Sequence, residues 1–174
     1  MIAAPVSIEA APPPAVNARL RELLAGVPDP EIPVLSVLDL GVVRHLRERA
    51  DGTIEVGVSP TYSGCPATRI IKADIVQALE RDGFRAVAVD VLSPPWTSDW
   101  ISEEGRRKLA SFGIAPPAET VASARRLLQP DLAIACPRCN STSTRKLSEF
   151  GSTPCKALYR CESCLEPFDY FKCI

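Results

Sequence analysis

Three segments carry apolar residues at the spacing of an amphipathic helix. Residues 17–26, NARLRELLAG, place leucines on one face between Asn17, a favourable N-cap residue, and Gly26, which favours helix termination. Residues 66–83 repeat this pattern after a proline, and a third helix is expected to begin after Ser102, whose hydroxyl suits a helix N-terminus. The pattern therefore predicts three helices before residue 116.

Shorter runs alternate apolar and polar residues, which is the pattern of strands. Residues 42–60 contain two such runs around Asp51-Gly52, a dipeptide that readily supplies the positive φ angles of a tight hairpin turn. Residues 84–93 alternate as a third strand, with valines at every second position. Two strands, a helix and a further strand predict an α+β fold, a small sheet with helices packed on one face.

Prolines mark the loops and the domain boundaries. Those at positions 28, 30 and 33 remove backbone donors and hold Asp29 and Glu31 in a stiff loop, where these carboxylates can cap a turn or ligate a metal. A second proline-bounded segment lacks a broad apolar face and indicates a linker. For 174 residues we expect a flexible tail, an α+β domain, this linker and a small cysteine-rich domain, with the boundaries 1–16, 17–115, 116–131 and 132–174.

The C-terminal segment contains two C-x2-C pairs, CPRC at 136–139 and CESC at 161–164. Each pair can bring two thiolates to one ion, and two pairs on facing hairpins complete a tetrahedral site. We expect structural zinc, whose binding would supply folding free energy to this short segment, with four ligands: Cys136, Cys139, Cys161 and Cys164. Rubredoxin-type iron fits the same spacing, and four reduced thiols without metal are the other alternative. For Cys155 and Cys173 three roles are open: ordinary buried thiols, further ligands of the same ion, or ligands of a second metal.

Cys65 stands alone in the loop TYSGCP, residues 61–66. Pro66 suits the first position of a helix, so we expect Cys65 at the N-cap, where free N–H groups and the helix dipole stabilise a thiolate. Such a thiolate can bind metal or act as a nucleophile, and the plain alternative is a cysteine that fills a gap. A Cys/His enzyme needs a general base, but the one histidine, His45, lies in a predicted strand where we expect a structural role.

Composition narrows the possible functions. The chain has 20 Lys or Arg and 21 Asp or Glu, so no field of one sign attracts nucleic acid or a membrane surface. The segment 136–174 has six Lys or Arg and four Asp or Glu, too slight an excess for a nucleic-acid-binding ribbon. The opening residues lack the charged and apolar regions of a signal peptide, and no apolar run reaches the roughly 20 residues of a membrane span. We therefore expect a cytoplasmic protein with reduced cysteines.

Four motifs resemble the small α+β family of iron-sulfur assembly factors that includes SufT and the cytosolic iron-sulfur targeting proteins: DPEIP, DLGVV, T-x3-CP and the PPW turn. The resemblance covers about residues 20–115, and Tyr62 and Ser63 stand where the family more often has small residues or proline. It implies functional roles for four residues, the last a reactive cysteine: Asp29, Glu31, Thr61 and Cys65. Nearly the whole chain resembles one branch of this family, which belongs to aerobic phenylacetate catabolism. This closer resemblance rests on the two C-x2-C pairs and on the ending GSTPCKALYRCESCLEPFDYFKCI.

That branch would connect the chain with the phenylacetyl-CoA epoxidase system, in which a di-iron oxygenase receives electrons from a flavin and iron-sulfur reductase. The sequence has neither the E-x2-H pairs of a di-iron bundle nor a G-x-G-x-x-G nucleotide turn, so we expect a component that is not itself catalytic. We expect Cys65 to hold iron or an iron-sulfur cluster transiently, in a site that Asp29 and Glu31 shape. The recipient would be the oxygenase or the reductase, which would dock on the zinc ribbon. The alternative is an electron-transfer or structural subunit, stably bound, with iron at the C-terminal cysteines. The resemblance also implies a homodimer.

Overall fold

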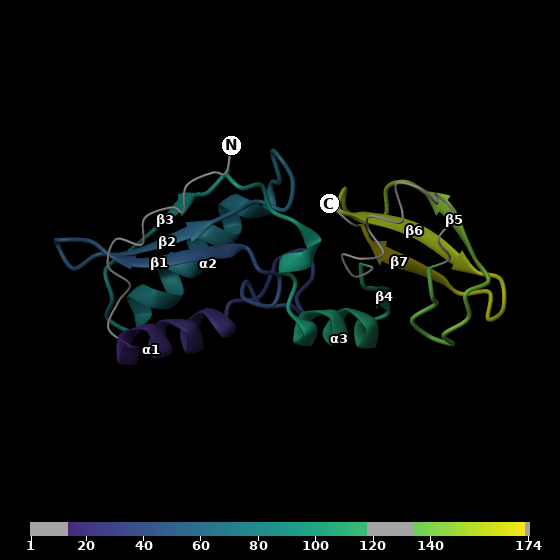
Figure 1. The fold of residues 1–174 in the computed structure, drawn as a ribbon, viewed down its shortest axis with the longest axis horizontal. Coiled ribbons are helices and arrows are strands. Elements are labelled where there is room, and N and C mark those ends of the chain that lie inside the picture. The colour runs from purple at the N-terminus through teal and green to yellow at the C-terminus, as the bar shows by residue number, and fades with distance from the viewer. Residues whose placement is uncertain (1–13, 118–133, 173–174) are drawn as a thin grey trace, which may run out of the picture.

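The computed structural model describes residues 14–117 and 134–172. The predicted tail, apart from residues 14–16, and most of the predicted linker lie outside the described residues. The elements follow one another in this order (Figure 1): α1 (Pro14–Ala25), β1 (Val43–Glu48), β2 (Ile54–Val58), α2 (Ala67–Arg81), β3 (Ala86–Asp90), the 3₁₀ turn η1 (Ser98–Trp100), α3 (Glu103–Phe112), β4 (Ile114–Ala115), β5 (Thr144–Ser148), β6 (Lys156–Cys161) and β7 (Pro167–Phe171).

The first sheet has the strand order β1-β2-β3. β1 and β2 form the predicted antiparallel hairpin, and Gly52 in its turn has a φ of 77°. β2 and β3 are parallel, with Ile54 beside Ala86 and Val58 beside Asp90. Parallel neighbours require a crossover connection, and α2 provides it. The predicted α+β fold is confirmed.

His45 has the structural role that the sequence predicted. It lies in β1 opposite Gly57 of β2, and its Nε2 is 2.9 Å from Oε1 of Glu55. A Cβ atom on Gly57 would lie 2.2 Å from the imidazole ring, so the ring covers the space that a side chain would need.

The core of the first domain lies between the sheet and the helices α1 and α2. It contains side chains from all of these elements, among them Leu20, Leu24, Ile54, Val56, Val58, Ile71, Ile75 and Leu79. α1 begins at Pro14 and not after Asn17, so the predicted N-cap is wrong; Asn17 Oδ1 instead accepts a hydrogen bond from Nε of Arg21 at 3.0 Å. No helix in the described part of the chain has the length and apolar character of a membrane span.

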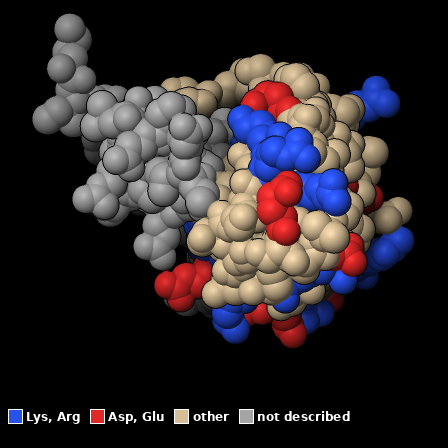
Figure 2. Space-filling view, turned by 90° about the vertical axis from the view of Figure 1, so that its right-hand side faces the viewer, with Lys and Arg blue, Asp and Glu red and all other residues tan. Residues whose placement is uncertain are grey.

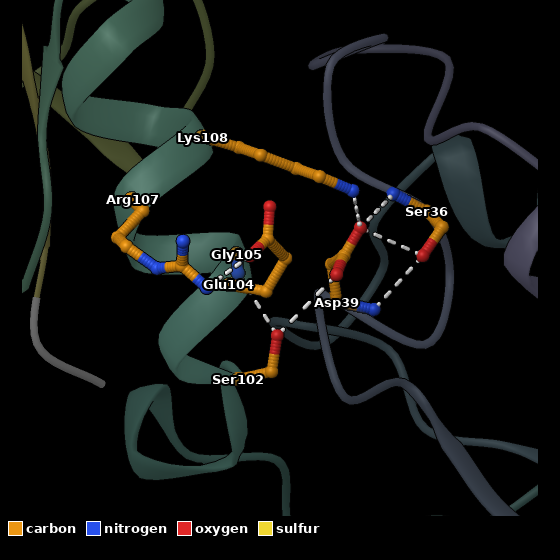
Figure 3. A network of polar contacts seen from close by, with 7 residues as sticks. All are labelled: Ser36, Asp39, Ser102, Glu104, Gly105, Arg107 and Lys108. Atoms are coloured by element: carbon orange, nitrogen blue, oxygen red, sulfur yellow. Dashed lines mark hydrogen bonds and ion pairs between the residues drawn. The ribbon is translucent and has the colours of Figure 1, made fainter.

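α3 is fixed to the rest of the first domain by a polar network around Asp39 (Figure 3). Ser102 caps the helix as predicted, accepting a hydrogen bond from the Gly105 N–H at 2.9 Å. Lys108 reaches from α3 across to Asp39 and donates to Oδ2 at 2.7 Å, while the Ser36 N–H and hydroxyl donate to the same oxygen at 2.9 and 2.8 Å. Burial alone would raise the pKa of Asp39, but the hydrogen bonds from Lys108 and Ser36 outweigh it and lower this pKa.

The second sheet has the order β4-β7-β6-β5 and joins the two domains. β4, which directly follows α3, pairs in parallel with β7, so the first domain supplies one edge of the C-terminal sheet (Figure 1). At the end of β7, Phe171 is buried in the first domain's core, 6.0 Å from Trp96 between ring centroids. Trp96 in turn is buried and donates from Nε1 to the carbonyl of Leu40 at 3.0 Å, which anchors the indole in the core. The two domains therefore share a packed seam.

Candidate functional site

The four predicted zinc ligands meet at one end of the second sheet. Their Sγ atoms all lie within 4.8 Å of one another. The sulfur atoms of Cys136 and Cys164 are 3.7 Å apart, and those of Cys139 and Cys161 are 3.5 Å apart. Four sulfurs at about 2.3 Å from a tetrahedral zinc ion would be separated by about 3.8 Å. The spacing of these thiols therefore fits zinc without rearrangement of the backbone.

The backbone of both knuckles is shaped to present sulfur atoms to an ion. The residue after each second cysteine has a left-handed conformation, with φ of 58° at Asn140 and 66° at Leu165. A bulky residue rarely adopts this conformation, so the turn that contains Leu165 is held by its surroundings. The Cys164 N–H donates to Sγ of Cys161 at 3.4 Å, and this bond, aided by the Ser163 N–H, lowers the pKa of Cys161 to about 6. Cys161 is thus readily deprotonated, as metal binding requires.

Several charged groups on the ribbon domain are paired with one another. Figure 2 shows the face at the ribbon end of the molecule, where blue and red side chains are interspersed over a largely uncharged surface. Arg145 lies 3.2 Å from Glu162, and Lys146 lies 2.8 Å from Glu149. In these two pairs the carboxylate offsets the charge of the basic group.

A second candidate site is a small pocket at the seam between the two domains. The free space within it is about 10 Å³, enough for about one water molecule. All four residues that the resemblance implied for the reactive site line this pocket: Asp29, Glu31, Thr61 and Cys65. The ribbon domain contributes Cys155 and Phe171 to the same lining. The pocket therefore combines groups from three distant parts of the chain.

Cys65 lies one position farther from α2 than predicted. Pro66 is the N-cap and has helical backbone angles, φ −66° and ψ −27°, and the Cys65 carbonyl accepts from the Thr68 N–H at 3.2 Å. Cys65 is partly exposed, and its backbone N–H donates to the Tyr62 carbonyl at 3.1 Å. Burial and the neighbouring Cys65 and Glu31 side chains raise the pKa of Tyr62 to about 12, so its phenol remains a hydrogen-bond donor at neutral pH.

Asp29 and Glu31 have different geometries. Asp29 is buried, and its Oδ1 accepts the N–H groups of Glu31 at 2.9 Å and Ile32 at 2.7 Å, so one of its oxygens caps the turn. Burial raises the pKa of Asp29 against these two hydrogen bonds. Burial and the charge of Asp29 also raise the pKa of Glu31, while Lys156 acts in the opposite direction on both carboxyls. This loop can therefore cap its own turn through Asp29 Oδ1 and still offer carboxylate oxygens to a metal.

Sequence reasoning missed what the ribbon domain brings to this pocket. Cys155 is 3% exposed, and Sγ is 3.0 Å from the hydroxyl oxygen of Thr153. Burial, the charge of Glu31 and the nearby Cys65 side chain raise the pKa of the Cys155 thiol, although Thr153 and Lys156 oppose this. Lys156 is 4% exposed, with Nζ 3.7 Å from Oδ2 of Asp169. The sequence placed Cys155 only near the zinc knuckles, because no local pattern reveals contacts between domains.

Ser59 is another pocket residue that the sequence did not single out. It directly follows β2 and is 1% exposed, and its backbone N–H donates to the Val42 carbonyl at 2.8 Å. Among residues 14–117 and 134–172, its hydroxyl is the one buried side-chain polar atom without a hydrogen-bond partner. Buried polar groups nearly always have a partner, so this hydroxyl in the pocket lining calls for an explanation.

The two sites differ in how closely their ligands are gathered. Within the described residues, the four ribbon cysteines form a compact group of metal-binding side chains, and the pocket residues do not form a second group of that kind. The ribbon centre thus has the ligand set that one metal ion requires. The pocket offers thiols and carboxylates without a closed coordination shell.

Two families match different parts of the chain. Residues 17–91 match the family described as "Iron-sulfur cluster assembly protein", and residues 120–172 match the "PaaD zinc beta ribbon domain". The first match contains Asp29, Glu31, Thr61 and Cys65, and the second contains all four ribbon cysteines.

Individual relatives agree with this division. A protein of Escherichia coli K12, named as one of the subunits of a "Putative 1,2-phenylacetyl-CoA epoxidase", is 50% identical over 163 residues, which cover 93% of this chain and 95% of the relative. An "Fe-S protein maturation auxiliary factor" of Porphyromonas gingivalis W83 is 37% identical over 89 residues, covering 50% of this chain and 84% of that protein. A crystal structure of a domain of unknown function from Bacillus anthracis matches with a TM-score of 0.50 at 23% identity, over 55% of this chain and 92% of that one. That structure supports the fold of the first domain.

Proposed function

This chain belongs to the PaaD family, and from that premise we propose that it is a non-catalytic maturation subunit of a phenylacetyl-CoA epoxidase system. In this proposal Cys65 binds iron or an iron-sulfur cluster for a short time. The cargo then passes to the di-iron oxygenase or to the iron-sulfur flavin reductase of the system. Asp29, Glu31 and Thr61 shape the site at Cys65, and the ribbon domain binds the recipient.

The observation that supports this proposal most strongly is the lining of the pocket. Cys65 shares it with two carboxylates, in the domain that matches iron-sulfur cluster assembly proteins. Thiolate and carboxylate oxygen are both ligands of iron in proteins. An incomplete ligand set suits a carrier, because a closed site with four protein ligands would retain its ion.

The size of the pocket argues against catalysis on phenylacetyl-CoA at Cys65. Sites for small molecules usually enclose about 300–1,000 Å³. The free space at Cys65 is about 10 Å³. A CoA thioester would have to lie outside this pocket, so the pocket itself does not hold this organic substrate.

We assign zinc with a structural role to the four-cysteine centre. The sulfur spacing fits a tetrahedral ion, and this segment matches a zinc ribbon family. Four thiolates complete the coordination of zinc and leave no open position for a reacting molecule. The ion would stabilise the ribbon domain, whose own apolar cluster is small.

The test compares wild type, Cys65→Ser and Ser63→Ala, all purified without oxygen from cells that use phenylacetate. Ser63 is an exposed residue of the same loop and controls for the effect of a substitution there. We expect about one zinc per chain in all three proteins. Visible absorption from iron and cellular epoxidase activity should be lost only in Cys65→Ser.

Full epoxidase activity in cells that carry Cys65→Ser would contradict the proposal. Iron that remains in Cys65→Ser, with a loss of zinc from the preparation, would instead place iron at the ribbon cysteines.

A further inference from the structure

The ribbon domain places a cysteine in the pocket of the first domain. Cys155 lies outside the four-cysteine centre, just before β6, and belongs to the buried core around the pocket. It lines the same cavity as Cys65, although the two are about 90 residues apart in sequence. The shared lining results from the docking of β7 and its Phe171 onto the first domain, so Cys155 lines the pocket of Cys65 only when the two domains are packed together.

Cys155 has the character of a ligand more than that of a filler. Its thiol contacts the Thr153 hydroxyl at 3.0 Å, and the side chains around it in the pocket include Asp29 and Glu31. An apolar side chain would fill the same seam without placing a thiol beside two carboxylates. Lys156, buried next to it, supplies a positive charge that offsets the negative charge of the pocket.

The Ser59 hydroxyl points independently to a polar occupant. It lines this cavity at 1% exposure and has no hydrogen-bond partner among the described residues. A buried hydroxyl without a partner is unfavourable, and native proteins rarely contain one. A sulfur or oxygen atom bound in the pocket would give this hydroxyl its acceptor.

We propose that Cys155 is the second thiolate ligand of iron bound at Cys65, so that the cargo is held between the two domains. This inference rests on the proposed function and extends it to the ribbon domain. Two thiolates and the carboxylates of the same lining form a mixed set that iron accepts. The pocket residues do not form a closed group of ligand atoms in the described structure, so binding draws the two thiols and the carboxylates closer together.

The test uses the full-length, zinc-loaded chain without oxygen, titrated with Fe²⁺ alone. X-ray absorption at the iron edge counts the sulfur neighbours, and competition with a chromogenic chelator gives the dissociation constant. Wild type should show two sulfur neighbours. Cys155→Ala should show one, with affinity weaker by about tenfold or more, and Cys65→Ser should lose the site. Ile71→Val is the matched control, since it removes a methyl group from the same lining and leaves both thiols in place.

The outcomes distinguish two claims: that Cys155 and Cys65 share one iron site, and that Cys65 carries iron. If Cys155→Ala binds Fe²⁺ with two sulfur neighbours and unchanged affinity, the shared site is wrong while the role of Cys65 stands. If Cys65→Ser keeps wild-type binding, the proposed function itself fails. Four sulfur neighbours in wild type would place the iron in the ribbon and overturn both. If Cys155→Ala folds poorly, Cys155→Ser replaces it, because it changes the side chain less. The number of sulfur neighbours in wild type tests the shared site without any variant.

Discussion

Replacement of Ser59 by alanine is expected to stabilise the protein. The Ser59 side chain is 1% exposed, and its hydroxyl has no partner in the described structure. Burying such a hydroxyl costs about 1–3 kcal/mol. Its removal also loses a few dispersion contacts of about 0.1–0.2 kcal/mol each. The free energy of unfolding should therefore rise by about 1–2 kcal/mol, which is unusual for a substitution at a buried site.

Ser36→Ala is the matched control, because Ser36 is a buried serine of the same domain with a fully used hydroxyl. Its Oγ donates to Asp39 at 2.8 Å and accepts the Asp39 N–H at 3.0 Å. A hydrogen bond to a charged group contributes about 1.5–3 kcal/mol. The control should therefore be destabilised by about that amount, so the two serines are predicted to differ in sign.

Urea unfolding of the zinc-loaded chain at fixed free zinc measures both changes. Fixed zinc matters because bound metal adds to the apparent stability. The slope with urea should stay constant, so that a shift of the midpoint reports stability alone. If Ser59→Ala is destabilised by about 1 kcal/mol or more, the hydroxyl has a partner in solution, such as a water in the pocket, and the reasoning is refuted.

Two further predictions concern the Asp39 network and the zinc ribbon. Asp39 has a folded pKa below its unfolded value of about 3.9, so its stabilisation is fully present above that pH and is lost as pH falls through the folded pKa. Asp39→Asn should lower the free energy of unfolding by about 1–3 kcal/mol at pH 7. Urea titrations of both proteins should show this difference shrinking below about pH 4. A difference that does not depend on pH would exclude the ionised carboxylate as its cause. Removal of zinc with a chelator should abolish the near-ultraviolet circular dichroism of the aromatic cluster Tyr159, Phe168 and Tyr170, and this signal should recover when zinc is added. The helical far-ultraviolet signal of the first domain should remain. An unchanged aromatic signal without zinc would show that the ribbon folds unaided.

Local patterns in the sequence were enough to predict the elements of the first domain. The hairpin at Asp51-Gly52, the apolar face of α2 and the Ser102 cap each depend on residues within a few positions of one another, and all three are present. The zinc knuckles were predictable for the same reason, since C-x2-C spacing is a local geometric requirement for two ligands of one ion.

Contacts between distant segments account for most of what the sequence did not reveal. β4 has two residues, too few for a strand pattern, and it becomes a strand only because β7 lies beside it. Cys155 and Ser59 meet at the pocket through the docking of one domain on the other, and no period or motif connects them. The start of α1 was a smaller error, since proline at the first turn is compatible with a helix and gives no clear boundary.

The stability of the fold explains the ribbon centre but not the pocket at the seam. The four ribbon thiols have the spacing that one ion requires, so their clustering is what a folded, metal-bound ribbon needs. At the seam, by contrast, burial raises the pKa of a carboxyl and of a thiol, and a hydroxyl in the same cavity has no partner among the described residues. Perturbed pKa values that cluster in one cavity are typical of functional sites. Because the two domains both supply such groups, the ligand of this pocket is expected to depend on the contact between them.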